Sequence, residues 1–258
     1  MPAPLRARVV ALLMLLVHAL AAPASAGLAD TVARVKPSVV IVGTFRATDS
    51  PRFQLRGTGF LVGDGQRVVT NAHVLPDGPA SPGEPALVVQ VRTGAGEWQV
   101  RAATLVGRDD ARDLALLHMA GATGPALRLG DSARVREGDS LAFTGFPIGG
   151  VLGFAPVTHR ALVSSITAAA LPSPSAHRLK EQAIRSLRQG SFNIFQLDAT
   201  AYPGNSGGPL FHPDTGEVVG VMNMVLIKGT RESALSQPSG LSYAIPVRHV
   251  HELLKRHP

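Results

Sequence analysis

A serine with glycines on both sides is the first candidate for chemistry. Ser206 lies in the run Pro203–Leu210, directly before Gly207, and the run leads into an apolar segment. Glycines carry no Cβ, so they permit the tight turn on which a nucleophilic hydroxyl is exposed. Such a turn can also aim backbone N–H groups at a developing oxyanion. Taken alone, the run could also be a β-hairpin that contains a serine.

A histidine and an aspartate upstream could activate this serine. His73 follows the β-branched segment 68–70, and Asp113 stands immediately before the apolar run Leu114–Leu117. A serine hydroxyl needs an adjacent base at neutral pH, and a carboxylate can hold that base in the correct tautomer. The chain order His73, Asp113, Ser206 is that of chymotrypsin-type sites and differs from the order in subtilisin-type and α/β-hydrolase sites.

Each of the three residues also has an ordinary structural explanation. A histidine at a strand end is commonly a hydrogen-bonded polar residue, and an aspartate is commonly a solvated turn residue. Asp109 and Asp110 compete with Asp113. We favour Asp113 because it alone abuts the apolar run, where a desolvated carboxylate best orients a histidine. Histidines without a comparable motif are interpreted as structural or surface residues: His118, His159, His177 and His212.

Together the three residues predict acyl transfer by a serine nucleophile. We expect His73 to accept the Ser206 proton and Asp113 to stabilise the resulting imidazolium. The backbone N–H groups of Gly204, Asn205 and Ser206 are the expected oxyanion donors. This chemistry requires no metal and no organic cofactor, so we expect neither.

The elements that must position these residues are short β-strands. Segments rich in β-branched residues alternate with Gly, Pro and Asp turns, a pattern typical of an all-β sandwich or barrel. The expected strands are 38–45, 57–63, 67–71, 86–92, 97–106, 114–119, 140–145, 158–167, 193–199, 208–212, 217–224 and 241–245. They predict two six-stranded antiparallel β-barrels, over about 37–120 and about 138–246. The candidate site then lies between the barrels, a common place for ligand clefts.

Helices are expected at three places. Short helices should lie near the N-terminus and over about 247–256. In the insert 170–190, Ser175 is a favourable N-cap, and apolar residues recur at helical spacing over about 176–188. This inserted helix could cover a barrel flank, or it could be a mobile cover or docking element near the active cleft.

The first 26 residues have the pattern of a secretory signal. Arg6 and Arg8 precede the apolar stretch Val9–Ala22, and a small-residue cleavage pattern ends at Ala26. The stretch is short for a membrane span, and an uncleaved anchor is the alternative interpretation. We expect 1–26 to be a signal peptide. The remainder should then be a single exported domain, periplasmic or extracellular, without stable membrane insertion.

Composition narrows the classes of partner. The chain has 258 residues, no cysteine and a formal net charge of +7. An exported domain without cysteine must rely on core packing, for which this length is sufficient. The positive charge is modest, and one Trp and two Tyr offer little surface for base stacking. We therefore expect no nucleic-acid partner.

Four motifs in order resemble the HtrA/Deg family of trypsin-like serine proteases. They are Gly57–Val62, Thr70–Val74, Asp113–Leu117 and Gly204–Leu210. The resemblance implies a chymotrypsin-like protease domain over 27–258, without the PDZ domain that commonly follows in the family. It also implies endopeptidase activity on unfolded or damaged polypeptides, and a homo-oligomer.

Two residues depart from digestive relatives of this family. Asn205 stands where they carry an aspartate that pairs with a newly cut N-terminus, so the resemblance implies control by loop ordering instead. Thr200 stands where trypsin-like enzymes that cut after Lys or Arg carry an aspartate. We therefore expect small or medium apolar side chains before the scissile bond, with a glutamyl-specific pocket as the alternative. The expected pocket residues are Thr200, Val221, Met222, Asn223 and Met224.

Two other function classes compete with a protease. One is a catalytically silent peptide-binding or chaperone module on a protease fold. A binding scaffold has no need for all three residues, which argues against it. The other is an esterase, against which the chain order and the barrel pattern argue.

Overall fold

The computed structural model describes most of the chain after the predicted signal. The described residues are 27–76, 83–93, 96–121, 124–147, 153–168, 192–223 and 240–258. The predicted signal peptide 1–26, the predicted helix near 176–188 and Met224 lie outside them.

The first six strands close into an antiparallel barrel. They are β1 (Val39–Phe45), β2 (Phe53–Val62), β3 (Arg67–Thr70), β4 (Ala86–Arg92), β5 (Trp98–Asp109) and β6 (Leu114–Met119). They pair in the order β1-β2-β3-β6-β5-β4.

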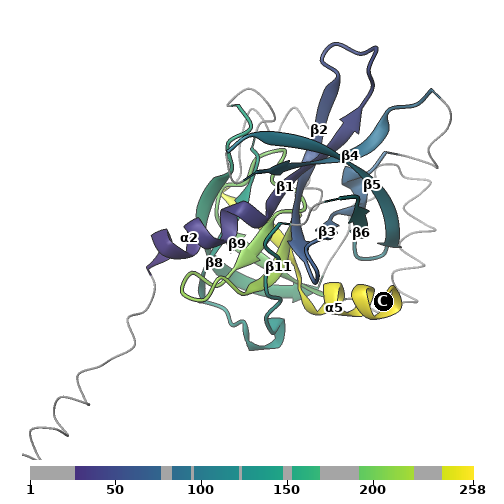
Figure 1. Cartoon of the computed structure of the whole chain (residues 1–258). Helices are drawn as coiled ribbons and strands as arrows, with labels where there is room; N and C mark the ends of the chain where they lie inside the picture. The colour runs from purple at the N-terminus through teal and green to yellow at the C-terminus, as the bar shows by residue number, and fades with distance from the viewer. Residues whose placement is uncertain are drawn as a thin grey trace, which may run out of the picture.

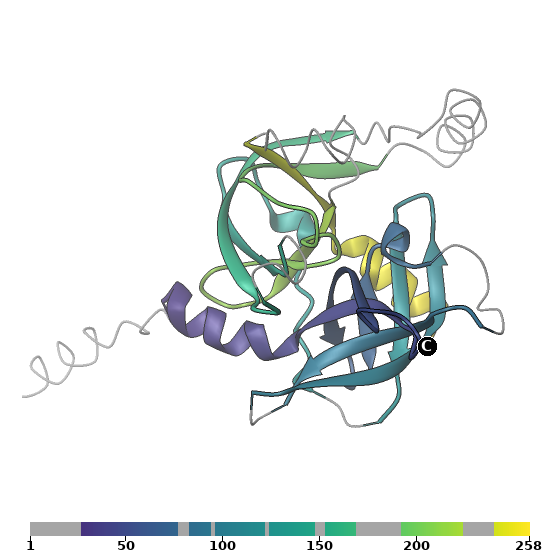
Figure 2. The same cartoon turned by 90° about the horizontal axis from the view of Figure 1, so that it is seen from above.

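The second six strands form another closed barrel. They are β7 (Ser140–Gly145), β8 (Val157–Ala168), β9 (Asn193–Asp198), β10 (Pro209–Phe211), β11 (Val218–Asn223) and β12 (Leu241–Pro246). Their order is β10-β11-β12-β9-β8-β7, again antiparallel throughout. The two barrels lie side by side (Figures 1 and 2). The predicted all-β, two-barrel fold is confirmed.

Two strands extend by three or more residues beyond an end that the sequence pattern predicts. β2 begins at Phe53 rather than 57, because the hairpin with β1 continues to the pair Phe45 and Phe53. β5 continues to Asp109 because a register shift between Leu105 and Gly107 keeps it paired with β6. The longer β5 places Asp109 inside the fold, close to the candidate aspartate.

Three buried apolar clusters hold the molecule together. One fills the first barrel and one fills the second. The third draws side chains from both barrels, among them Phe60, Leu116, Phe211 and Ile245. A cluster shared in this way holds the two barrels in a fixed relation and so supports a site between them.

Helices cover the seam between the barrels. α2 (Leu28–Val35) comes first, and its buried Thr31 donates to the carbonyl of Asp214 (3.2 Å). α5 (Arg248–Arg256) comes last, and it buries Val250 and Leu253 in the shared cluster. Short 3₁₀ turns lie at Lys36–Ser38, Ala72–Val74 and Ser132–Arg134. No helix within the described ranges is long and apolar enough to cross a membrane.

Candidate active site

His73 lies on a single turn that follows strand β3. The strand ends at Thr70, and the 3₁₀ turn Ala72–Val74 (η2) begins after Asn71. Arg56 on β2 holds the far side of this turn, because its Nε donates to the carbonyl of Val74 (2.5 Å). A second donor of Arg56, Nη2, contacts the next carbonyl, that of Leu75 (2.8 Å). The far end of the turn is therefore fastened to β2.

Asp113 grips His73 through both carboxylate oxygens. Oδ1 accepts the His73 backbone N–H (2.8 Å), and Oδ2 lies 2.6 Å from His73 Nδ1. A carboxylate accepts only, so the neutral ring carries its proton on Nδ1 and keeps the Nε2 lone pair for a substrate proton. The imidazole is 30% exposed and the carboxylate 14%. The pair therefore lies at the surface of the fold, where a substrate can reach the ring.

The backbone of Asp113 is itself unusual. Its φ is +54°, a left-handed conformation that few non-glycine residues adopt. Its carbonyl accepts from Asn71 Nδ2 (2.9 Å) and from the Ala72 N–H (3.2 Å). These bonds tie the aspartate to the residues directly before His73. Sequence reasoning missed this role of Asn71.

A residue of the second barrel also contacts Asp113. The buried Asn223, at the end of β11, donates from Nδ2 to Asp113 Oδ2 (2.7 Å). The sequence prediction placed Asn223 in the substrate pocket, and the structure places its amide on the Asp113 carboxylate. A lone amide that ends the apolar strand Val218–Asn223 is the sequence signal that could have pointed to this contact.

The loop between β9 and β10 brings Ser206 to the same seam. Gly207 has a φ of +85°, and a Cβ there would collide with the Thr58 carbonyl and with Thr70 Oγ1. The turn therefore packs against the strand that leads to His73. On the other side, the Thr58 N–H donates to the Ser206 carbonyl (2.8 Å). The neighbouring Gly57 lies against both Val74 and Ser206.

The predicted oxyanion donors have different surroundings. Gly204 has a φ of +103°, and its carbonyl accepts from Thr58 Oγ1 (2.6 Å). Its N–H has no acceptor among the described residues, so it can serve a ligand. The prediction that the Asn205 N–H is an oxyanion donor is corrected, because this N–H already donates to the Tyr202 carbonyl (3.0 Å) and closes the turn. Gly204 and Ser206 remain the predicted donors.

The Asn205 side chain is enclosed. It is fully buried and lies against Gly145 at the end of β7. Within the described part of the chain, neither of its amide atoms has a hydrogen-bond partner. The side chain at this position carries no charge, and that a new N-terminal ammonium does not pair here stays a prediction.

Two residues predicted to form an apolar pocket wall, Val221 and Met222, lie in buried cores instead. Val221 is fully buried in the shared cluster, and Met222 is fully buried in the second barrel. β11 is paired on both sides, so its alternating side chains fill two cores and neither lines an open pocket. The apolar run was consistent with a strand buried on both faces, which periodicity alone does not separate from a pocket wall. Thr200 is half-buried and remains a predicted pocket residue.

Comparisons with known proteins agree with this geometry. The profile of the trypsin-like peptidase domain matches residues 57–221, which include His73, Asp113 and Ser206. The chain is 32% identical over 200 residues to the mitochondrial serine protease HTRA2 of Drosophila willistoni, and equally to that of Drosophila pseudoobscura pseudoobscura. Each match covers 78% of this chain and 38% of the relative, so the chain spans about two fifths of those proteins.

A solved structure shares the fold. The HtrA-type protease AlgW with a tripeptide matches 89% of this chain and 63% of its own, with a TM-score of 0.62 and 24% identity. The resemblance that the four sequence motifs predict is thereby confirmed.

Proposed function

Because the chain belongs to the family of trypsin-like peptidases, we propose that it is a serine endopeptidase of HtrA type. The observation that carries the proposal is the two-point grip of Asp113 on His73, with Nδ1 and Oδ2 2.6 Å apart. That contact fixes the tautomer and leaves Nε2 as a general base. A protein that only binds peptides has no use for such an arrangement.

The reaction proceeds in two acyl transfers. Ser206 Oγ forms a bond to the peptide carbonyl carbon while His73 Nε2 takes the hydroxyl proton. The C–N bond then breaks, and His73 returns the proton to the leaving amine. Water attacks the acyl-enzyme, again through His73, and releases the new carboxyl terminus. Asp113 stays ionised and stabilises the imidazolium in both steps.

Backbone donors stabilise the tetrahedral intermediates. The N–H groups of Gly204 and Ser206 bind the oxyanion, and removal of one such donor typically costs about 3–4 kcal/mol of transition-state stabilisation. Thr58 supports them, because its hydroxyl accepts the Phe146 N–H (3.0 Å) and donates to the Gly204 carbonyl. The loop is thus braced from β2 of the other barrel.

The proposed substrate and location rest on the family resemblance and on sequence patterns. Substrates are exported polypeptides that are unfolded or damaged, in line with the HtrA resemblance and with the tripeptide in the AlgW structure. Thr200 is uncharged, so it offers no carboxylate that could pair with a substrate Arg or Lys before the scissile bond. The pattern of residues 1–26 supports export to the periplasm or the extracellular space. Light scattering tests the homo-oligomer implied by the resemblance.

One experiment separates a protease from a silent peptide-binding module. Protein lacking 1–26 is treated with a serine-directed fluorophosphonate, the adduct is located by mass spectrometry, and unfolded casein is offered in parallel. We expect an adduct on Ser206 and casein degradation, both lost in His73→Ala. A folded protein that neither reacts nor degrades casein, even on warming, would instead be a binding module.

A further inference from the structure

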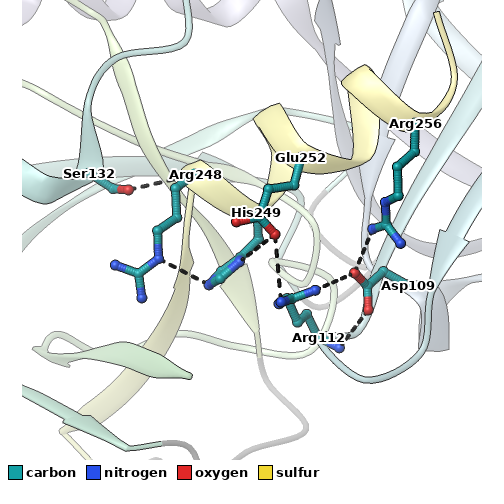
Figure 3. Close-up of polar contacts among 7 residues, drawn as sticks. All are labelled: Asp109, Arg112, Ser132, Arg248, His249, Glu252 and Arg256. Carbon is teal, nitrogen blue, oxygen red and sulfur yellow. Dashed lines mark hydrogen bonds and ion pairs between the residues drawn. The ribbon is translucent and has the colours of Figure 1, made fainter. Parts of the chain in front are cut away.

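A group of ion pairs joins the last helix to the loop that carries Asp113 (Figure 3). We call it the Asp109 cluster, and it consists of Asp109, Arg112, Glu252 and Arg256. The Asp109 carboxylate accepts from Arg112 Nη1 (2.9 Å) and from Arg256 Nη2 (2.8 Å). Arg112 Nη2 also lies 3.6 Å from Glu252 Oε2. Two residues of α5 therefore hold Asp109, at the end of β5, and Arg112, in the loop between β5 and β6.

The centre of the cluster is a buried charge. The Asp109 side chain is 4% exposed. Burial alone would raise its pKa, but hydrogen bonds from Arg256 and Arg112 outweigh burial and hold the pKa below its ordinary value. A buried carboxylate of this kind is stable only while its partners stay in place. Its geometry is therefore strongly specified.

The Asp109 cluster includes the residue directly before Asp113, the proposed catalytic aspartate. Arg112 precedes Asp113 in sequence, and both its backbone N–H (3.2 Å) and its guanidinium contact Asp109. Asp113 next to it has the left-handed φ of +54°. A non-glycine residue persists in this conformation only where its surroundings hold it there. The Asp109 cluster holds the residue before Asp113, and the bonds to its carbonyl hold the other side.

The same end of α5 contacts the strand that leads to His73. The His257 carbonyl, just past the helix, accepts from Arg67 Nη1 (2.6 Å), and Arg67 is the first residue of β3. The His257 ring packs against Gly107 on β5, where a Cβ would displace it. One helix end thus fixes both strands that supply the first-barrel catalytic residues.

We propose that Asp109 and Arg256 are positioning residues, through which the C-terminal helix sets the orientation of Asp113 toward His73. The inference rests on the proposed protease function. Neither residue touches substrate, so neither is a catalytic residue. Disturbing them should alter catalysis more than substrate binding, because a small displacement of an orienting carboxylate weakens the transition state selectively.

Arg256→Ala is the primary test, measured as kcat and KM on an unfolded-protein substrate. We expect kcat to fall about tenfold with KM changed less than about twofold. The acidic limb of the kcat/KM profile should move to lower pH, since a misplaced Asp113 stabilises the His73 imidazolium less. Arg256→Lys keeps the cation and should restore most of the rate. Arg128→Ala, which removes an exposed pair with Glu217, is the matched control and should have no effect.

Asp109→Asn keeps the shape and removes the charge, so it tests the same contact if Arg256→Ala folds poorly. A lowered melting temperature with unchanged kcat, KM and pH profile would overturn the inference and leave the cluster a purely structural feature. The downfield proton resonance of His73 Nδ1 gives a readout without turnover. We expect this resonance to weaken in Arg256→Ala, whereas an unchanged resonance would contradict the inference. A wild type without turnover contradicts only the proposed protease.

Discussion

Asp113 is the residue on which the two barrels converge. It binds His73 from the first barrel, and it accepts from Asn223 of the second through Oδ2 (2.7 Å). Oδ2 therefore receives two donors, one from His73 and one from Asn223. Loss of the Asn223 amide would leave Oδ2 with His73 as its remaining side-chain partner, so we expect this change to affect the proposed reaction more than the fold.

Asn223→Ala should lower kcat while leaving the protein folded. The substitution removes one hydrogen bond to a charged group, an interaction typically worth about 1.5–3 kcal/mol. We expect kcat to fall roughly 10- to 100-fold if that bond serves the transition state, with a smaller change in KM. Steady-state kinetics on a casein-derived peptide measure both constants. An unchanged kcat would show that the carboxylate is held adequately without Asn223.

Gly207→Ala should destabilise the fold more than the same substitution at a glycine with open space beside it. A left-handed φ costs alanine about 1–2 kcal/mol, and the collision with Thr58 and Thr70 adds about 1–3 kcal/mol. Gly138 is the matched control, because its φ is +90° and nothing lies within 4 Å of a Cβ there. Urea unfolding of Gly207→Ala and Gly138→Ala separates the two contributions. Equal losses in the two variants would argue against close packing of the serine loop.

At the scale of elements, strand β8 of the second barrel carries a half-buried histidine. His159 stacks on Phe143 of β7, with ring centroids 4.8 Å apart. Its buried Nε2 has no hydrogen-bond partner in the described ranges. Burial lowers the pKa of His159, so its neutral form is favoured in the fold. The residue thus acts as an aromatic packing element rather than as a base.

His159→Phe should reduce the loss of stability in mild acid. A group with a lowered folded pKa contributes stability in full above its unfolded pKa of about 6.5, and that contribution is lost as the pH falls below this value. Phe cannot take up the proton, so the free energy of unfolding should fall less between pH 7.5 and pH 5. Urea titrations at both pH values measure it. His118→Gln, at an exposed position of β6, should retain the wild-type slope.

His249 explains why some dependence should persist in that variant. It is buried on α5, and burial lowers its pKa as well. It also contacts Glu252, which belongs to the Asp109 cluster (3.4 Å). A His159→Phe protein whose slope matches the wild type would assign the acid sensitivity to α5 instead.

At the scale of the whole molecule, the two barrels share one apolar cluster. Leu253 of α5 belongs to it, together with side chains of both barrels. The barrels should therefore unfold together rather than one after the other. The candidate site depends on this fixed packing of the two barrels, because Ser206 and Asn223 come from one barrel and His73 and Asp113 from the other.

Leu253→Ala should lower the stability of the whole molecule in a single transition. Buried leucine to alanine substitutions typically cost about 2–5 kcal/mol. Far-UV circular dichroism and Trp98 fluorescence should report the same unfolding midpoint. Trp98 of the first barrel contacts Phe146, which directly follows β7 of the second barrel (5.5 Å between ring centroids), so its fluorescence responds to both barrels. Leu105→Ala, at a leucine that is 49% exposed, should change stability by less than about 0.5 kcal/mol. Two separate midpoints would contradict the shared core.

Local patterns were sufficient to predict the strands and to select Asp113 as the aspartate that contacts His73. Strand positions follow from β-branched runs and turn residues, both of which act within a few residues. Asp113 stood out from Asp109 and Asp110 because it abuts the buried run of β6. The same local pattern could not separate a pocket wall from a core strand, which is why Val221 and Met222 were misplaced.

The sequence alone determined the two-barrel fold class, the order of His73, Asp113 and Ser206, and the uncharged character of Asn205 and Thr200. Only the tertiary structure decided that Asn223 contacts Asp113 and that Arg256 reaches Asp109. These contacts join residues far apart in the chain, such as Asp113 and Asn223. Such pairs meet only after both barrels have closed and α5 has packed on them, and no local preference encodes that geometry.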